Sequence, residues 1–287
     1  MLRRVRILKL KTCLLVVCGF MIAFGQSSQT DNASKEAIGR ARAAYLKKDF
    51  ALARKELESA LAIRKDLAEP RLLLGMIAWH EGKIDAAIKS VREAIKLQPD
   101  YPEARYVMGR LYVEKRDWKR AEEETNLALS QGPKSADLYA LLGAIALAQE
   151  RYEPAVKFFE HALAQPPQNG EVANEIRIKM DAVKNYVEFQ ANKGNADFQT
   201  PKMTVKGQRP EVPFRQSTVK LAGIINEQGR FAPILVIYAS DQQMAEIYLK
   251  YVTEMQFTPA MKKGAIVPIW RTMEFQSSVS VRVQSIP

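Results

Sequence analysis

Few residues in this chain combine the types and the spacing that acid–base or metal chemistry needs. Its 287 residues contain two histidines, His80 and His161, and neither has a second ligand at a metal-binding spacing. The sequence contains neither a Gly-rich phosphate loop nor a nucleophile motif, and the adjacent acids Glu122, Glu123 and Glu124 point in different directions along a helix. We therefore expect no catalytic residue, no metal site, no cofactor and no small-molecule substrate, and we predict that the protein is not an enzyme.

The N-terminal segment has the pattern of a secretory signal peptide. Basic residues between Arg3 and Lys11 precede a short apolar core, which ends in the small-residue sequence Ala23-Phe24-Gly25. We expect residues 1–25 to be removed by cleavage after Gly25, so that the mature chain is exported and is periplasmic or associated with the cell envelope. Both cysteines lie in this segment, and the mature chain therefore has no thiol or disulfide chemistry.

Two other interpretations of residues 1–25 stay open. A retained membrane anchor needs about 17 to 25 apolar residues, whereas the apolar core here is shorter. A lipoprotein signal needs a small residue just before the cysteine, and Cys18 follows Val16 and Val17 instead. If the segment is retained, we expect membrane contact through this segment alone.

Positive charge is spread along the chain rather than clustered. The net charge is +11, and five of these charges belong to the signal segment, which leaves +6 on the mature chain. Lys and Arg alternate with Glu, as in Lys119-Arg120-Ala121-Glu122-Glu123, which is typical of solvated helix surfaces. Nucleic-acid-binding proteins usually carry a clustered basic patch, so we expect no nucleic-acid partner.

A period of 34 residues organises the first two thirds of the chain. Small residues, prolines and large apolar residues all recur with this spacing. The recurring positions are Ala53, Ala87, Ala121 and Ala155; Ala60, Ala94, Ala128 and Ala162; Gly75, Gly109 and Gly143; Pro99, Pro133 and Pro167; and Phe50, Ile84, Trp118 and Tyr152. Such a period is the signature of a helical repeat array.

The spacing predicts two helices in each repeat unit. Paired helices approach closely only where a small side chain lies at the crossing, and the alanines seven residues apart face one side of the second helix. Glycine in a helix costs about 1 kcal/mol relative to alanine, so the glycines indicate a second backbone close by. We expect helix pairs over 34–67, 68–101, 102–135 and 136–169, followed by a capping helix over 171–190.

These repeats closely resemble the tetratricopeptide repeat, which implies an all-α solenoid over residues 34–191 that binds protein partners. The resemblance implies a concave groove lined by the first helix of each unit, and a peptide with acidic or apolar character would suit it. The groove residues that it implies are Arg42, Tyr45, Met76, Trp79, Tyr106 and Arg110. An alternative for Tyr45 and Trp79 is that they pack between helices.

The composition changes after the repeats. We expect residues 26–33 to be a disordered leader and residues 192–213, which are rich in Gly and Pro, to be a linker with one short strand near 203–206. This composition predicts few contacts between the repeats and the C-terminal region.

Beyond the linker, the apolar pattern changes from a helical to an extended period. We expect strands over 218–225 and 231–239 joined by a turn, then a helix over 242–255 with an N-cap at Ser240 or Asp241. A last strand follows over 266–276, and its extension through 279–283 stays open. Residues 214–287 are therefore predicted to form a small α+β domain.

This C-terminal order of elements resembles the TonB C-terminal domain. The family has a Phe-x-Pro-Ala element between the helix and the last strand, and Phe257, Pro259, Ala260 and Gly264 match it. The resemblance implies protein–protein contact in the periplasm, with an outer-membrane transporter or another envelope protein as the partner. An edge strand near 273–283 would make that contact by accepting a strand of the partner. Alternatively, Phe257 and Pro259 pack a small core and shape a turn.

Two functions follow from these features. The first is a non-enzymatic adaptor of the periplasm or envelope, in which the repeats hold one partner and the TonB-like domain touches another. The second is an atypical membrane-anchored energy transducer of the TonB type, which would serve outer-membrane transport. The short apolar core of the N-terminal segment and the lack of a long Pro-rich spacer favour the first.

Overall fold

The computed structural model describes residues 30–166, 170–205 and 217–277, and the expected signal peptide lies outside them. The chain divides into two compact units, Met1–Leu111 and Tyr112–Pro287. Within the described residues, no helix is long and apolar enough to cross a membrane. The same residues contain no group of three or more His, Cys, Asp or Glu side chains that could hold a metal ion.

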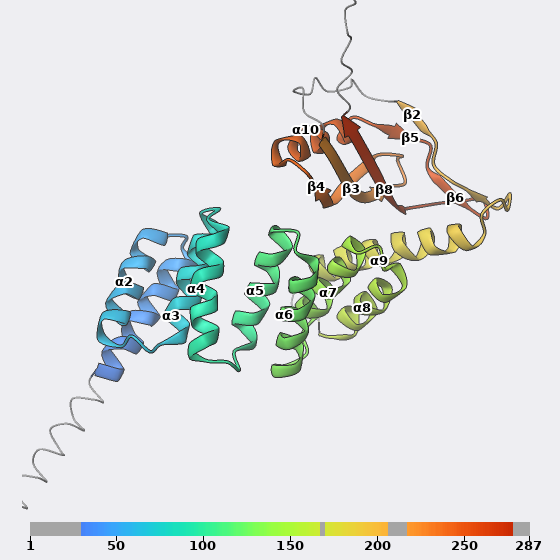
Figure 1. Ribbon diagram of the computed structural model, residues 1–287. Coiled ribbons are helices and arrows are strands. Elements are labelled where there is room, and N and C mark those ends of the chain that lie inside the picture. Colours follow the sequence, from blue (N-terminus) through green and yellow to red (C-terminus); the bar gives the residue numbers. More distant parts are fainter. Residues whose placement is uncertain (1–29, 167–169, 206–216, 278–287) are drawn as a thin grey trace, which may run out of the picture. The chain divides into compact units, whose positions relative to one another are not determined.

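Helices occur in pairs throughout the described part of the repeat region (Figure 1). A first helix over 30–46 pairs with α2 (Phe50–Ile63), α3 (Ala68–His80) with α4 (Ile84–Leu97), α5 (Pro102–Glu114) with α6 (Trp118–Gln131), and α7 (Ala136–Ala148) with α8 (Tyr152–Ala164). The additional helix α9 (Gly170–Ala191) follows. The predicted helix pairs and final helix are confirmed, whereas residues 30–33 of the expected disordered leader are helical. Asp31 explains this difference, because its carboxylate pairs with Arg64 of the first unit at 2.9 Å.

The repeated small residues lie where the sequence placed them, at the helix crossings. Ala53, Ala87, Ala121 and Ala155 are all 0% exposed. A Cβ atom added to Gly75 would lie 2.6 Å from Val91 Cγ2, and one added to Gly143 would lie 2.5 Å from the ring of Phe159. These contacts confirm that the repeat glycines permit a close approach of the paired second helix.

The turn inside each pair also recurs every 34 residues. Lys48, Gly82, Arg116 and Glu150 all have left-handed backbone angles, with φ of 59°, 74°, 56° and 57°. In each turn, the next residue donates its N–H back into the preceding helix, as Asp49 does to the Ala44 carbonyl at 2.9 Å. This pattern is a helix C-cap that usually prefers glycine, yet three of the four positions carry a longer side chain.

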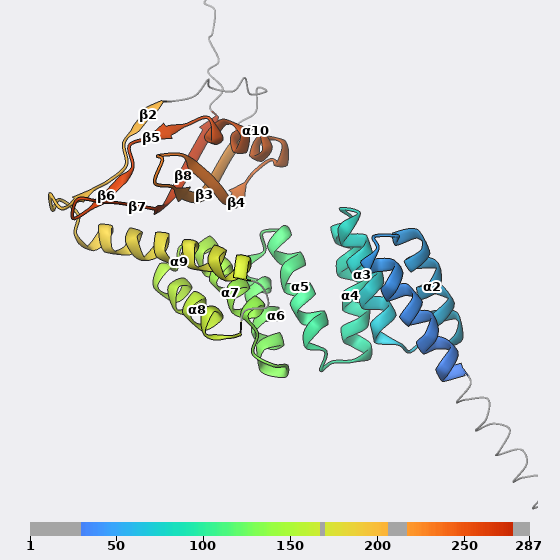
Figure 2. The same ribbon diagram turned by 180° about the vertical axis from the view of Figure 1, so that it is seen from behind.

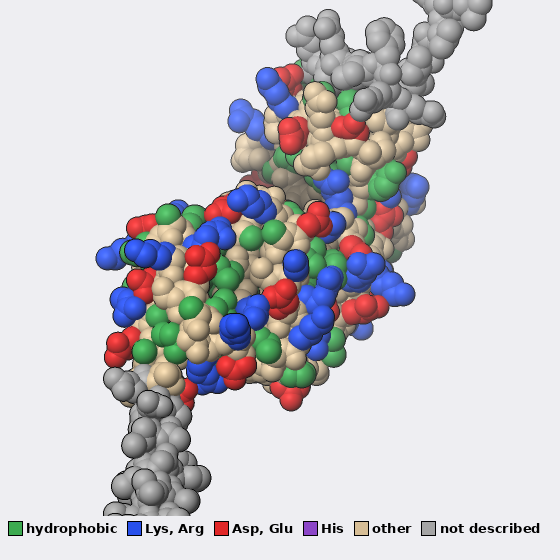
Figure 3. All heavy atoms as spheres, turned by 60° about the vertical axis from the view of Figure 1, so that its left-hand side comes forward, with side chains coloured by type: hydrophobic (Ala, Val, Ile, Leu, Met, Phe, Trp, Pro, Cys, Tyr) green, Lys and Arg blue, Asp and Glu red, His purple; other side chains and the backbone are tan. Residues whose placement is uncertain are grey.

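Acidic and basic side chains are mixed over the face shown in Figure 3 rather than separated. Within the first unit, Arg40 pairs with Glu56 at 2.8 Å, Arg54 with Glu81 at 2.7 Å, and Arg71 with Glu93 at 2.6 Å. Each pair joins neighbouring helices at partly exposed positions, where an ion pair contributes about 0 to 1 kcal/mol.

The C-terminal region contains small antiparallel sheets and one packed helix. Its elements are β1 (Phe198–Gln199), β2 (Met203–Val205), β3 (Ser217–Ile225), β4 (Phe231–Ala239), α10 (Gln242–Thr253), β5 (Gln256–Phe257), β6 (Ala260–Lys262), β7 (Ala265–Val267) and β8 (Ile269–Ser277). The sheet orders are β4-β3-β8, β1-β6-β7 and β2-β5. An α+β arrangement with a hairpin, a helix and a last strand is therefore observed as predicted, and Asp241 caps α10.

The segment expected to be a linker takes part in this architecture. Its strands β1 and β2 pair with β6 and β5, respectively. Between them, Lys202 and Thr258 exchange two hydrogen bonds, of 2.7 and 2.8 Å. Figure 2 shows α9 leading directly into these strands. Only one of the two strands was predicted, because a two-residue strand such as β1 has no detectable period.

Strand β3 lies in the middle of its sheet and is buried on both faces. Val219, Leu221 and Ile225 belong to a core shared with α10. The alternate residues Ala222 and Ile224 belong to a second core, which is shared with α7, α8 and α9. The sheet is therefore enclosed between α10 and the last helices of the repeat region.

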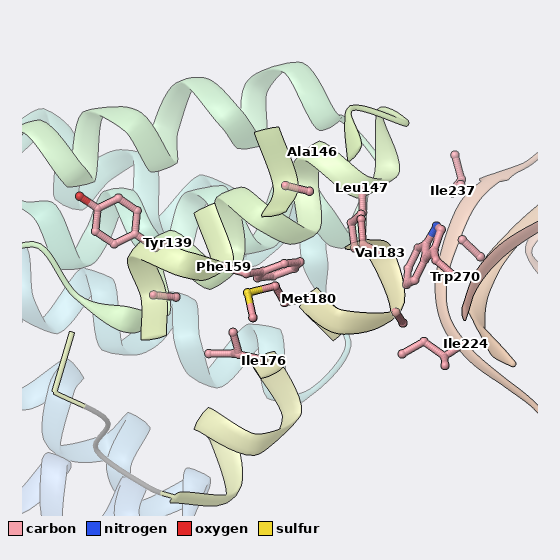
Figure 4. Close-up of a cluster of buried hydrophobic side chains, with 14 residues drawn as sticks. Tyr139, Ala146, Leu147, Phe159, Ile176, Met180, Val183, Ile224, Ile237 and Trp270 are labelled. Carbon is pink, nitrogen blue, oxygen red and sulfur yellow. The ribbon is translucent and has the colours of Figure 1, made fainter. Parts of the chain in front are cut away.

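Trp270 of β8 is central to this second core and is 0% exposed. Figure 4 shows its ring directed toward Val183 of α9 and Leu147 of α7. Polar contacts reinforce this packing, because Trp118 Nε1 donates to the Ile237 carbonyl at 3.2 Å and Asn185 Nδ2 donates to the Pro268 carbonyl at 2.8 Å. The expectation of few contacts between the repeats and the C-terminal region is thus wrong. A Gly- and Pro-rich composition describes local backbone and says nothing about the apolar faces on either side.

Candidate functional site

The six groove residues implied by the repeat pattern lie on the first helices of the first three repeats. Arg42 and Tyr45 belong to the helix over 30–46, Met76 and Trp79 to α3, and Tyr106 and Arg110 to α5. Arg42, Met76 and Arg110 occupy the same position of successive repeats, as do Tyr45 and Trp79. Arg42 and Arg110 are exposed and the other four are half-buried, so each of the six keeps some surface for a partner.

Trp79, Tyr106 and Arg110 come together as an aromatic and cationic cluster. The guanidinium carbon of Arg110 lies 4.5 Å from the centre of the Trp79 ring and 5.9 Å from the centre of the Tyr106 ring. A cation over an aromatic face is stabilised by about 0.5 to 1 kcal/mol at an exposed site. The contact therefore holds Arg110 against α3 and α5 while its side chain stays accessible.

Tyr45 joins a second aromatic group beside this cluster. Its hydroxyl lies 2.8 Å from His80 Nε2, and the His80 ring stacks on Phe50 with centroids 5.2 Å apart. Burial raises the pKa of Tyr45, and the positive charge of Arg110 partly offsets this increase. Arg110 therefore acts electrostatically on Tyr45 as well as on the two aromatic rings.

The remaining groove residues are arranged around an ion pair. Arg42 pairs with Glu69 at 2.5 Å, and Met76 lies half-buried on α3. Nearby, burial raises the pKa of Tyr101 to about 12, with the charges of Glu69 and Glu103 adding to the effect and that of Arg42 opposing it. The charge of Arg42 is thus largely balanced within the chain.

Sequence reasoning missed three members of this surface, namely His80, Tyr101 and Glu69. His80 was read as an ordinary helix residue because its only evident chemistry was metal binding. Its position directly after Trp79, at the end of α3, was the available signal. Tyr101 and Glu69 lie at the starts of first helices, outside the positions that the repeat pattern assigns to the groove.

The residues of the TonB-like motif are placed in a core and a turn. Phe257 is 6% exposed, Ala260 is 0% exposed, and both belong to the core shared with α10. Phe257 N–H donates to the Gly229 carbonyl at 2.8 Å, while Pro259 is half-buried at the start of β6. Gly264 has a φ of 80° in the turn between β6 and β7. This placement agrees with the packing alternative for Phe257.

The strand expected to lie at a sheet edge does so. In the order β4-β3-β8, strand β8 pairs on one side with β3 over its whole length, from Ile269 to Ser277. Phe275 of this strand stacks on Tyr248 of α10, with ring centroids 4.7 Å apart. The predicted extension over 279–283 lies outside the described residues.

The fold and the groove together define a helical repeat scaffold that presents aromatic and cationic side chains. Residues 78–145 match one tetratricopeptide-repeat family model, and residues 136–169 match another. Residues 78–169 therefore contain tetratricopeptide repeats, and such repeats are typically protein-interaction scaffolds. The matches lie within the repeat region, and the TonB-like identity of the C-terminal region stays a prediction.

Several known proteins are similar to part of the chain. The structure of PilF from Pseudomonas aeruginosa has a TM-score of 0.51 at 17% identity, covering 57% of this chain and 74% of PilF. MamA of Desulfovibrio magneticus RS-1 has a TM-score of 0.45 at 18% identity, covering 56% of this chain and 92% of that protein. The human protein O-mannosyl-transferase TMTC1 is 29% identical over 103 residues, which span 36% of this chain and 12% of the transferase. The likeness to PilF shows a shared fold alone.

Proposed function

We propose that the protein is a non-enzymatic adaptor of the periplasm or cell envelope that binds an extended peptide of a partner protein in the groove of its first three repeats. The cluster of Trp79, Tyr106 and Arg110 carries this proposal. Tryptophan, tyrosine and arginine are the side chains that most often dominate protein interfaces. Here they meet on successive first helices and keep exposed surface.

The fourth repeat supports this use of the groove, because its equivalent position is filled from within the chain. Leu147 of α7 follows Tyr45 and Trp79 in the repeat register and is 2% exposed. It packs in one core with Ile237 and Trp270 of the C-terminal sheet. Another polypeptide segment can thus cover a position of this row, and its members Tyr45, Trp79 and Val113 keep exposed surface for a partner.

The C-terminal sheet has two roles in this proposal. It covers the apolar face of α7, α8 and α9, and it offers the edge strand β8 to a second envelope protein, with an outer-membrane transporter as one candidate. The TonB-like order of elements supports such a contact. The burial of the opposite sheet face against the repeats means that any partner of β8 would be held at a fixed position relative to α7–α9.

Site-specific photo-crosslinking in cells tests the groove. A photoreactive phenylalanine analogue at Met76 should give a crosslinked partner, whereas the same analogue at Lys89, exposed on α4 of the same unit, should not. The Met76 product should disappear when Trp79 is changed to Ala, because the partner loses its aromatic contact. A product that forms equally from both positions, or that survives Trp79→Ala, would contradict peptide binding in the groove.

The N-terminus of the protein recovered from cells tests the proposed location. An adaptor in the periplasm should begin near Gln26, which mass spectrometry of the fractionated protein would detect. An intact N-terminus in inner membranes would instead support the membrane-anchored transducer.

A further inference from the structure

We propose that Arg110 and Tyr45 form an anionic subsite of the groove, which takes the carboxylate of an aspartate or glutamate side chain in the partner peptide. This inference rests on the proposed groove function and specifies the chemistry of its partner. It is carried by the charge balance and the geometry of the residues around Arg110.

Arg110 differs from four other arginines of the same unit, Arg40, Arg42, Arg54 and Arg71. Each of these four pairs with a glutamate at 2.5 to 2.8 Å. Arg110 has no carboxylate within ion-pair distance among the described residues, and its contacts are the two aromatic rings. An exposed cation in the groove therefore has no anionic partner within the described part of the chain.

The position of the guanidinium over Trp79 prepares it for a carboxylate. A ring contact uses the flat face of the guanidinium, whereas its N–H groups lie in its plane and point outward from its edge. These N–H groups match the two oxygens of a carboxylate in a bidentate arrangement. The Trp79 contact also restricts the side chain in the unbound protein, which lowers the entropy lost on binding.

Tyr45 adds a neutral donor beside the same aromatic side chains, because its partner His80 lies next to Trp79 with ring centroids 6.5 Å apart. Burial raises the pKa of Tyr45, and the positive charge of Arg110 partly offsets this increase. The Tyr45 hydroxyl already contacts His80 Nε2 at 2.8 Å, which orients it. When His80 donates in that contact, the hydroxyl proton is available to an anion beside Arg110.

The charge count favours a carboxylate over a phosphate group. Arg42 is the next cation of this repeat position, and Glu69 balances it. One unpaired permanent cation matches one singly charged carboxylate, whereas a phosphate carries about −1.5 to −2 at neutral pH and is usually bound by arginine clusters. The half-buried rings of Trp79 and Tyr106 beside Arg110 further favour a peptide with an apolar side chain next to its acid.

Selection from a random peptide library displayed on phage tests the inference. The displayed peptides are fused at their C-termini to the coat protein, so any acidic preference reports side chains and not a terminal carboxylate. We expect Asp and Glu to be enriched over the input library on the wild-type chain and on Arg40→Gln, the control for loss of an exposed arginine on the first helix. On Arg110→Gln, the acidic enrichment should fall to the input level.

One selected peptide and its Asp→Asn form then measure the contact directly by fluorescence anisotropy. Hydrogen bonds to charged groups contribute about 1.5 to 3 kcal/mol, so either Arg110→Gln or Asp→Asn should weaken binding by about tenfold or more. The two changes together should cost little more than one alone, because they remove the same contact. Tyr45→Phe should give a smaller loss with the same dependence on the acid.

The outcomes separate this inference from the function on which it rests. Peptides that bind in a Trp79-dependent way without acidic enrichment, or whose enrichment survives Arg110→Gln, would overturn the anionic subsite and leave the groove function intact. A failure to select any peptide whose binding depends on Trp79 would contradict both. Arg110→Gln should keep the helical circular dichroism of the wild-type chain and melt only slightly below it, because the exposed side chain loses no more than its two ring contacts.

Discussion

At the scale of single residues, the alanine at each helix crossing sets how closely two helices can pack. Ala121 and Ala128 of α6 are both 0% exposed, and Thr125 between them satisfies its hydroxyl on the Ala121 carbonyl. No space remains there for a larger side chain.

We expect Ala121→Leu to lower the free energy of unfolding by about 1 to 3 kcal/mol, because overpacking forces strained rotamers or a backbone shift. Chemical denaturation would measure the change. Glu123→Leu, on the exposed side of the same helix, is the control and should change stability by less than about 0.5 kcal/mol. An unchanged denaturation midpoint for Ala121→Leu would show that the crossing is open.

Two tyrosines give a prediction at alkaline pH. Burial raises the pKa of Tyr101 to about 12, and burial likewise raises the pKa of Tyr152 to about 12. An unfolded tyrosine ionises near a pKa of about 10, so the unfolded chain releases these protons first as the pH rises. The stability carried by the two neutral phenols is therefore complete below about pH 10 and is lost as the pH approaches 12.

Absorbance of the phenolate group during a pH titration would detect these late-ionising tyrosines. Tyr101→Phe should remove one of them without altering the tyrosines that titrate normally. If the phenolate signal lost in Tyr101→Phe belongs to the part that titrates near pH 10, the burial of this hydroxyl is not what the structure indicates.

At the scale of elements, β3 and β8 contribute to two hydrophobic cores. One is shared with α10, and the other is shared with α7, α8 and α9. Trp270 shares its core with residues of α7, α8 and α9, while β3 contributes to the core on the opposite face as well (Figure 4). A destabilising substitution in β8 should therefore also destabilise the repeat helices α7, α8 and α9.

Trp270→Ala should destabilise the second unit by about 3 to 5 kcal/mol, the usual cost of removing a buried tryptophan and leaving a cavity. The neighbouring change Arg271→Ala, at an exposed position, is the matched control. Hydrogen exchange followed by mass spectrometry should show faster exchange in α7 and α9 for Trp270→Ala alone. Protection of these helices equal to that of the wild-type chain would mean that the sheet does not support them.

The helices could be predicted from the sequence because small residues recur at a fixed spacing. Larger side chains would not fit at these close helix contacts. Gly75 lies against the backbone of α4, Gly143 lies against the Phe159 ring, and the alanines lie at helix crossings, so each repeat carries its own register. The contact between β8 and α9 has no such record. Trp270 and Val183 are ordinary apolar residues, and nothing local indicates which of two buried faces each will join.

The groove was predictable in part for the same reason. The resemblance to the tetratricopeptide repeat implied that Trp79 and Arg110 share one groove, and in the structure the Arg110 guanidinium carbon lies 4.5 Å from the centre of the Trp79 ring. The contact between the Tyr45 hydroxyl and His80 Nε2 joins the C-terminal ends of two successive first helices. A contact of this kind depends on side-chain directions at helix ends, which spacing does not specify.

At the scale of the whole molecule, the C-terminal region behaves as part of the second unit rather than as an attached domain. The division of the chain falls at Leu111, inside α5, and residues 112–287 form one compact unit. Its core takes residues from α7 through β8.

Deletion of residues 195–287 should therefore leave an array with an uncovered apolar face over α7 to α9. We expect the truncated chain to bind a hydrophobic dye and to melt at a lower temperature than the full chain, because the partners of Leu147 and Val183 are gone. A truncated chain with full-length thermal stability and no dye binding would show that the repeats are independent after all.

The order of these elements along the chain also bears on how the protein is made. The helices α7 to α9 emerge from the ribosome before β8, yet Trp270 is needed to complete their core. During synthesis, and again during any transfer of the chain across a membrane, these helices wait with an uncovered apolar face. Chaperones that bind apolar segments can therefore act from the synthesis of α7 until β8 has been made and packs on these helices.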